Sequence, residues 1–207
     1  MKNIYFTPAD VSKAELREKG SRFLGFVAPV SGEEDARGLI EVTARRYADA
    51  THVCWAWRIG MPASERSTDA GEPSGTAGVP MLQVLRGRNI SDTVALVVRW
   101  FGGVKLGKGG LARAYAGAVC LAADNARLDE RAPRIRVLVS VPYSRVGGVK
   151  RLIQPPEIEL AEQQYGERAV MVMSVVAWRH SELVEALADL GLEAEPDRPL
   201  ALDENER

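Results

Sequence analysis

A buried strand followed at once by a glycine-rich segment constrains this chain more than any other feature. Residues 93–100 form a nearly continuous apolar run, which is typical of a strand covered on both faces. Five glycines follow within residues 102–110, and an alanine-rich helix is expected over 111–128. Glycines at this density allow tight turns and bring backbone N–H groups to a surface that a ligand can approach closely.

The other elements expected in the first 132 residues alternate between strands and helices. Ser31 and Glu34 have the spacing of a capping box, so a helix is expected to begin there and to end near residue 47. Residues 61–68 are polar and are expected to form a loop. The remaining predicted elements are two strands within 11–29 separated at Gly20, a strand over 51–59 and a short helix over 76–85.

The pattern restarts near residues 129–133, which are the best candidate linker between two domains. Beyond this linker the predicted order is βαββαβ, the ferredoxin-like arrangement. The strands are expected over 135–141, 157–162, 168–177 and 192–195, and the helices over 144–154 and 181–190. The sequence therefore predicts an α+β protein with domains over 1–132 and 133–200 and an acidic tail over 201–207.

Charge and hydropathy limit the kinds of partner. The formal net charge of −1 at pH 7 argues against a nucleic-acid binder that uses its whole surface. Residues 86–113 nevertheless carry six basic side chains and one acid, so a polyanion site is expected there. No apolar run reaches the roughly 18 residues that span a bilayer, and the first residues are too polar for a secretion signal. We therefore expect a cytoplasmic protein that does not contact membranes.

No metal or cofactor site is predicted. Cys54 and Cys120 lie in apolar settings and are expected to be small buried residues rather than disulfide partners or nucleophiles. His52 and Cys54 are expected on one face of a strand, but two such ligands without a third make a poor metal site. We therefore expect no bound metal ion and no cofactor.

The glycine cluster is the first candidate site. It follows a buried strand and opens a helix, so its N–H groups and the helix dipole favour an anion. It is not a Walker loop, because no Gly-Lys-Ser/Thr ends it. The alternative is that the glycines only allow a tight strand-to-helix turn. The predicted phosphate-binding residues are Lys105, Lys108 and Arg113 with Arg99, Gly102, Gly103, Gly107, Gly109 and Gly110, and Arg86 and Arg88 are secondary candidates.

The loop over residues 69–78 is the second candidate site. Asp69 and Glu72 supply carboxylates, and Ser74 and Thr76 supply hydroxyls. An enzyme can use such groups, but the sequence shows no clear activating base, so no catalytic residue is assigned. The alternative is that Glu72 caps backbone N–H groups nearby or at the start of the next helix.

Four long motifs carry a resemblance to a known family. They are Ser21-Arg22-Phe23, Ala50-Thr51-His52-x-Cys54-x-Ala56, Asp69-Ala70-Gly71-Glu72-Pro73-Ser74-Gly75-Thr76-Ala77-Gly78-x-Pro80, and Val98-Arg99-Trp100-Phe101-Gly102-Gly103-x-x-Leu106-Gly107-x-Gly109-Gly110-Leu111-x-x-Ala114-Tyr115. Through them the chain resembles the YigZ/IMPACT family, densely over the first domain. The second domain looks like the companion domain of bacterial members. Ala70 stands where the family usually has a second acid.

The resemblance implies both folds and a role. The first domain is expected to share the βαβ fold of a small-subunit ribosomal protein and of domain IV of elongation factor G. The second is expected to be similar to the ferredoxin-like domain V of that factor. Two consecutive domains in the order of a ribosome-contacting factor imply a translation-related role. The eukaryotic relatives look like regulators that act through a translational-control partner.

Three functional hypotheses remain at this point. The leading one is a non-enzymatic protein that recognises structured RNA or the ribosome through the glycine cluster and its basic side chains. The second is an enzyme acting on a phosphorylated or nucleotide substrate, with Glu72 as acid or base and the glycines as an anion cradle. The third is a protein–protein adaptor in translational control. The oligomeric state is left open.

Overall fold

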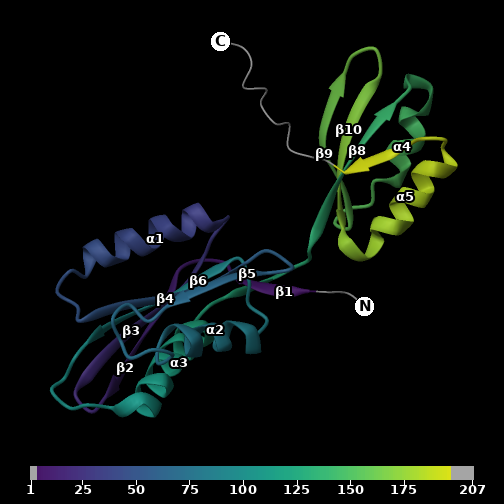
Figure 1. Cartoon of the computed structure of the whole chain (residues 1–207). Coiled ribbons are helices and arrows are strands. Elements are labelled where there is room, and N and C mark those ends of the chain that lie inside the picture. Colours follow the sequence, from purple (N-terminus) through teal and green to yellow (C-terminus); the bar gives the residue numbers. More distant parts are fainter. Residues whose placement is uncertain (1–3, 197–207) are drawn as a thin grey trace, which may run out of the picture. The chain divides into compact units, whose positions relative to one another are not determined.

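The computed structural model describes residues 4–196. The acidic tail expected over 201–207 lies outside them. Within the described range the chain divides into two compact units, residues 4–131 and 132–196 (Figure 1). Each unit has its own sheet and its own hydrophobic core. That each unit folds by itself stays a prediction.

A five-stranded sheet is the centre of the first unit. The sheet and the helices around it consist, in chain order, of β2 (Ser12–Glu18), β3 (Ser21–Pro29), α1 (Glu33–Arg46), β4 (His52–Ile59), β5 (Ser64–Thr68), α2 (Gly78–Gly87), β6 (Thr93–Trp100) and α3 (Gly107–Asp124). The strand order is β2-β3-β6-β4-β5. Because β3 and β4 both pair antiparallel to β6, they run parallel to each other on either side of it. The helix α1 connects them, so the unit contains a split βαβ.

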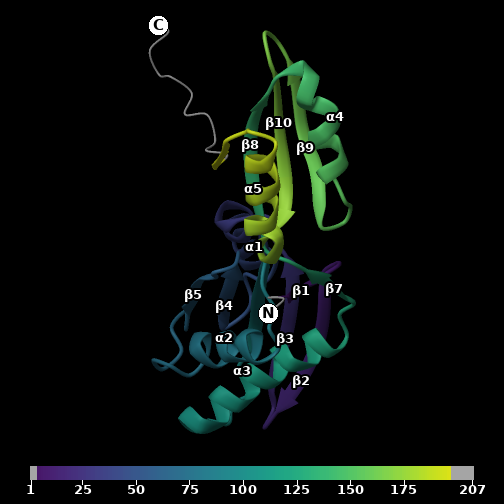
Figure 2. The same cartoon turned by 90° about the vertical axis from the view of Figure 1, so that its right-hand side faces the viewer.

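Helices cover both faces of this sheet. Figures 1 and 2 show α1 on one face and α2 with α3 on the other. The central strand β6 therefore meets a helix layer on each side, and seven of its eight residues are buried, as the apolar run predicted. Phe23, Met81 and Tyr115 are in the core on the α2–α3 face, and Trp57 and Leu96 are in the core on the α1 face.

The prediction of a loop over residues 61–68 is wrong for its second half. Residues 64–68 form β5, which pairs antiparallel with β4 at the edge of the sheet. An edge strand is held through backbone hydrogen bonds to one neighbour and keeps much of its side-chain surface exposed, so polar residues suffice for it. Local hydropathy therefore gave no signal for this strand.

The predicted capping box is also wrong. The N-cap of α1 is Gly32, and it makes no side-chain cap. Instead, the Asp35 carboxylate accepts hydrogen bonds from the backbone N–H and the hydroxyl of Ser31, at 3.0 and 3.2 Å. The helix begins where the motif predicted, but the carboxylate one position later makes the contact.

The predicted limits of the alanine-rich helix are both too late in the sequence. The helix α3 begins at Gly107, so three of the clustered glycines lie inside it, and it ends at Asp124. Residues 128–131 then form β7 (Leu128–Arg131), which pairs with β1 (Tyr5–Pro8) in a separate two-stranded sheet. Neither of these short strands was predicted.

The second unit has the predicted βαββαβ order. Its elements are β8 (Arg134–Val141), α4 (Val146–Leu152), β9 (Ile158–Tyr165), β10 (Ala169–Val176), α5 (His180–Asp189) and β11 (Ala194–Pro196). The antiparallel sheet has the order β11-β8-β10-β9, which is the ferredoxin-like arrangement. The α+β fold class is confirmed. No helix within residues 4–196 is long and apolar enough to cross a bilayer.

Candidate functional site

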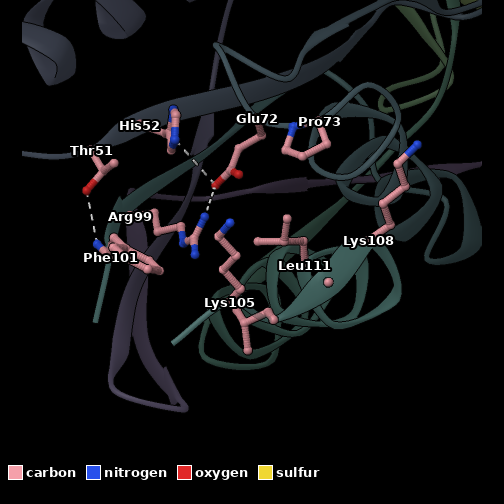
Figure 3. Close-up of a pocket in the computed structure, with 11 residues that line it drawn as sticks. Thr51, His52, Glu72, Pro73, Arg99, Phe101, Lys105, Lys108 and Leu111 are labelled. Carbon is pink, nitrogen blue, oxygen red and sulfur yellow. Dashed lines mark hydrogen bonds and ion pairs between the residues drawn. The ribbon is translucent and has the colours of Figure 1, made fainter. Parts of the chain in front are cut away.

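A pocket of about 410 Å³ lies in the first unit where the start of β4, the loop before α2, the end of β6 and the start of α3 meet (Figure 3). Its walls are Thr51, His52, Glu72, Pro73, Arg99, Phe101, Lys105, Leu106, Gly107, Lys108 and Leu111. His52 on β4 pairs in register with Arg99 on the neighbouring β6. Glu72 comes from the loop over 69–78, and Lys105 and Lys108 come from the glycine cluster, so the pocket brings residues from both predicted sites together.

Glu72 is the acidic group of this pocket. Its side chain is 3% exposed, and Oε1 accepts hydrogen bonds from Arg99 Nη1 at 2.5 Å and from the Tyr115 hydroxyl at 2.7 Å. The interpretation that Glu72 caps backbone N–H groups is wrong, because these partners are side chains. A buried carboxylate loses its hydration, and the Arg99 charge with the Tyr115 donor compensates for that loss.

Arg99 was predicted to bind phosphate, but the structure places it in the buried ion pair. The residue is 5% exposed, and its guanidinium carbon lies 5.3 and 5.6 Å from the ring centroids of Phe23 and Phe101. Its Nη2 lies 3.5 Å from Ser21 Oγ, and its Nε has no hydrogen-bond partner within residues 4–196. Arg99 thus holds Glu72 in place and is not an exposed phosphate contact.

His52 was not among the predicted site residues. Its Nδ1 lies 2.9 Å from the carbonyl oxygen of Ala70, and its Nε2 lies 3.9 Å from Glu72 Oε1. A carbonyl oxygen only accepts hydrogen bonds, so Nδ1 carries the proton. In the neutral ring Nε2 is then an acceptor on the pocket wall. Only the register of β4 with β6 reveals this role.

The Asp69 carboxylate holds the loop over 69–78 through hydrogen bonds from its backbone. Its Oδ1 accepts hydrogen bonds from the N–H groups of Ala77 and Gly78 at 2.8 and 2.9 Å, and its Oδ2 accepts one from Gly75 at 2.8 Å. Burial alone raises the pKa of Asp69, but these backbone donors outweigh it and hold the pKa below its ordinary value. Asp69 therefore stabilises the loop and the start of α2, and it does not line the pocket.

Replacing Asp69 by alanine is expected to lower the free energy of unfolding by about 2 kcal/mol at neutral pH. Because the folded-state pKa is lowered, this contribution is fully present above the unfolded pKa of about 4 and is lost as the pH falls through the folded value. Urea denaturation of both proteins at decreasing pH measures it. The exposed Asp10→Ala is the control, with an expected change within about 0.5 kcal/mol. A deficit that stays constant down to strong acid would contradict this role of Asp69.

Ser74 and Thr76, the hydroxyl residues of this loop, do not line the pocket. Ser74 is exposed, whereas Thr76 is buried and its hydroxyl donates to the carbonyl oxygen of Pro73 at 2.6 Å. Thr76 therefore supports the shape of the loop. Of the four loop residues singled out from the sequence, the structure brings Glu72 alone to the pocket.

The clustered glycines have different structural roles. At Gly102 an added Cβ would lie 1.9 Å from the carbonyl carbon of Gly20, so its backbone packs directly on the turn between β2 and β3. Gly103 and Gly107 have φ angles of +87° and +72°, which strongly favour glycine. Gly109 and Gly110 lie in the first turn of α3. The turn interpretation thus explains Gly102, Gly103 and Gly107.

Lys105, Lys108 and Arg113 are exposed, and none of them makes an ion pair with another residue of the described range. Lys105 and Lys108 also line the pocket. They flank the start of α3, which has no side-chain cap. By contrast, Arg86 and Arg88 are both held in ion pairs. The free positive charge of this region is therefore concentrated at the N-terminus of α3.

Two protonated groups lie under the pocket. Burial raises the pKa of the Cys54 thiol to about 12 and raises the pKa of the Tyr115 hydroxyl well above its ordinary value. The thiol donates a hydrogen bond to the Asp69 carbonyl oxygen at 3.0 Å, so it is structural rather than nucleophilic. Cys54 and Cys120 are both free. Residues 4–196 contain no group of three or more His, Cys, Asp or Glu side chains placed to hold a metal ion.

The family described as "Impact N-terminal domain" matches residues 19–123. The IMPACT family member YvyE from Bacillus subtilis is 38% identical over 168 residues, covering 81% of this chain and 77% of YvyE. The IMPACT family member YigZ from Escherichia coli is 32% identical over 174 residues, covering 83% of this chain and 85% of YigZ.

Two solved structures are also similar. A crystal structure of a hypothetical protein is 28% identical and covers 96% of this chain and 99% of its own, with a TM-score of 0.69. The structure of the two-domain translational regulator Yih1 is 27% identical and covers 58% of this chain and 45% of its own, with a TM-score of 0.36. By the match over residues 19–123 and by its curated relatives, the chain belongs to the IMPACT family.

Proposed function

We propose that this IMPACT family member is a translation-related binding protein that recognises phosphates of structured RNA, such as ribosomal or transfer RNA. Lys105, Lys108 and Arg113 contact the phosphates together with the first N–H groups of α3. The observation that carries the proposal is the group of three exposed, unpaired cations around a helix N-terminus without a side-chain cap.

The start of α3 suits an anion for three reasons. The helix has 18 residues, so its dipole is developed, and its first N–H groups have no partner within the helix. The lysines are exposed, so they lose little hydration when they meet a phosphate. The N–H groups of Phe101 and Gly102 already donate to Thr51 and Ser21 hydroxyls. The backbone N–H groups that contact the phosphate are therefore those of residues 107–110.

The translation-related part of the proposal rests on the family. Its two domains resemble consecutive domains of a ribosome-contacting elongation factor, and the eukaryotic members look like regulators of translation. Recognition of RNA phosphates through a small basic area is compatible with the overall net charge of −1, because the basic side chains are concentrated rather than spread over the surface.

The triple variant Lys105→Ala, Lys108→Ala and Arg113→Ala is expected to bind RNA more weakly and with a shallower salt dependence. Each lost phosphate contact lowers the slope of log K against log salt by about 0.7–0.9, so three contacts lower it by about 2–3. Fluorescence anisotropy with a labelled transfer RNA, between about 50 and 200 mM salt, measures both effects.

A matched control replaces three exposed arginines elsewhere in the first unit, Arg45, Arg46 and Arg127, by alanine. This variant loses the same formal charge but none of the proposed phosphate contacts. Its salt slope is therefore expected to change by less than that of the site variant. If both triple variants lower the slope of log K against log salt by the same amount, the RNA contact is not at α3. If the protein binds no RNA but retains a protein partner after nuclease treatment, the adaptor hypothesis replaces this proposal.

A further inference from the structure

One oxygen of the buried Glu72 carboxylate has no donor. Arg99 and Tyr115 both donate to Oε1, and His52 Nε2 also approaches this oxygen. No residue within 4–196 donates a hydrogen bond to Oε2. The side chain is 3% exposed and lines the pocket, so water reaches this carboxylate only through the pocket. Glu72 Oε2 is not among the buried side-chain atoms of residues 4–196 that lack a partner, so this oxygen is open to the pocket. An N–H group of a ligand in the pocket can therefore donate a charge-assisted hydrogen bond to it.

The charge balance indicates what kind of donor fits. Arg99 already neutralises Glu72 in an ion pair whose two side chains are 6% and 3% exposed. A second buried cation would have to be desolvated without a matching anion, whereas a neutral amino group would not. A primary amino group carries two hydrogens. The pocket wall offers two acceptors for them, Glu72 and, in the neutral ring, Nε2 of His52, which lies 3.9 Å from Glu72 Oε1.

The remaining walls favour a flat ring with an anionic end. Phe101 is 47% exposed at the pocket, and Pro73, Leu106 and Leu111 add apolar surface. An exposed aromatic ring beside positive charge is a common stacking platform for a base. Lys105 and Lys108 line the same pocket and supply positive charge (Figure 3). A volume of about 410 Å³ falls within the range of roughly 300–1,000 Å³ of small-molecule sites.

We propose that the pocket binds a nucleotide whose base carries an exocyclic amino group. The amino group donates to Glu72 and His52, the ring packs on Phe101, and the phosphate lies on Lys105 and Lys108. The phosphate contacts rest on the proposed function, whereas the base contacts do not. The nucleotide is either a base turned out of an RNA chain or a free mononucleotide, since both present the same groups to the pocket.

The test compares three pairs of 5′-monophosphates that differ at the amino group: AMP with purine riboside monophosphate, CMP with UMP, and GMP with IMP. Titration calorimetry with the full chain measures each Kd. At least one amino-bearing member is expected to bind about tenfold or more tightly than its partner, which is the range for a hydrogen bond to a charged group. Octanucleotides that carry the same pairs, with an abasic octamer as reference, test the RNA source.

Phe101→Ala is expected to weaken binding of the preferred nucleotide by about 5- to 150-fold, the range for loss of one base–aromatic stack. Tyr165→Ala, which removes an exposed aromatic side chain of the second unit, is the control and is expected to leave the Kd unchanged. The melting temperature of both variants reports whether they are folded. Glu72→Gln is expected to reduce the difference in Kd between the two members of the preferred pair of nucleotides.

Three outcomes separate the two proposals. Equal affinities within every pair, both as monophosphates and within octanucleotides, overturn the base-recognition proposal. If the salt slope of RNA binding still depends on Lys105 and Lys108 in that case, the proposed function stands alone. If a monophosphate pair is discriminated but RNA is not bound, the pocket is a mononucleotide site and the RNA proposal fails.

Discussion

Replacing Arg99 by methionine is expected to lower the free energy of unfolding by about 3–5 kcal/mol. The variant removes the charge that balances Glu72, whose side chain is 3% exposed, and it leaves the carboxylate with the Tyr115 hydroxyl as a donor. A typical domain has about 5–15 kcal/mol of stability, so this loss removes a large part of the total. Urea denaturation followed by circular dichroism measures the change.

Two controls identify the buried charge as the cause. Arg45→Met breaks the exposed ion pair with Glu41, whose side chains are 76% and 69% exposed, and is expected to change the stability by about 0.5 kcal/mol or less. Adding Glu72→Gln to Arg99→Met removes the unpaired charge, so the double variant is expected to regain part of the loss. A single Arg99 variant that loses less than about 1 kcal/mol would show that Glu72 is not buried as a charged group.

Gly102→Ala is expected to cost about 3 kcal/mol, near the upper end of the usual overpacking penalty. An added Cβ would lie 1.9 Å from the carbonyl carbon and 2.1 Å from the carbonyl oxygen of Gly20. Both atoms belong to the backbone, so no side chain can rotate away and the turn between β2 and β3 has to move. Chemical denaturation measures the lost stability.

Gly109→Ala is the control for Gly102→Ala within the same glycine cluster. An added Cβ there would lie 3.5 Å from Arg113 Nη1, an ordinary contact, and the residue is in the first turn of α3. Alanine is favoured over glycine in a helix by about 0.5–1 kcal/mol, so this variant is expected to be as stable as the parent or slightly more stable. Equal destabilisation by the two substitutions would contradict the close approach of Gly102 to Gly20.

The candidate site was only partly visible in the sequence. Glu72, Lys105 and Lys108 were singled out because their loops are rich in glycine and charge, and all three line the pocket. His52 was considered as a metal ligand and Phe101 carried no signal beyond its motif. Their roles depend on neighbours across the sheet and around the pocket, and no local pattern specifies those neighbours.

The second unit was predictable because its signals are local. Apolar alternation in strands, helical periodicity and the order of elements are properties of short segments, and they were sufficient for the βαββαβ arrangement. The polar edge strand β5 and the pairing of β1 with β7 escaped prediction for the opposite reason. Short strands such as these are defined by the partner that their backbone finds, and that partner can be far away in the sequence.

The sequence by itself determined the α+β class, the buried central strand, the glycine segment and the local excess of basic residues. Tertiary structure alone decided which charges are free and which are buried. Glu72 meets Arg99 across 27 positions and Tyr115 across 43, while Lys105 and Lys108 remain unpaired at the surface of the described unit. The physical reason is that an ionisable side chain takes its role from the desolvation and the partners that the fold imposes on it, and both arise from contacts between distant parts of the chain.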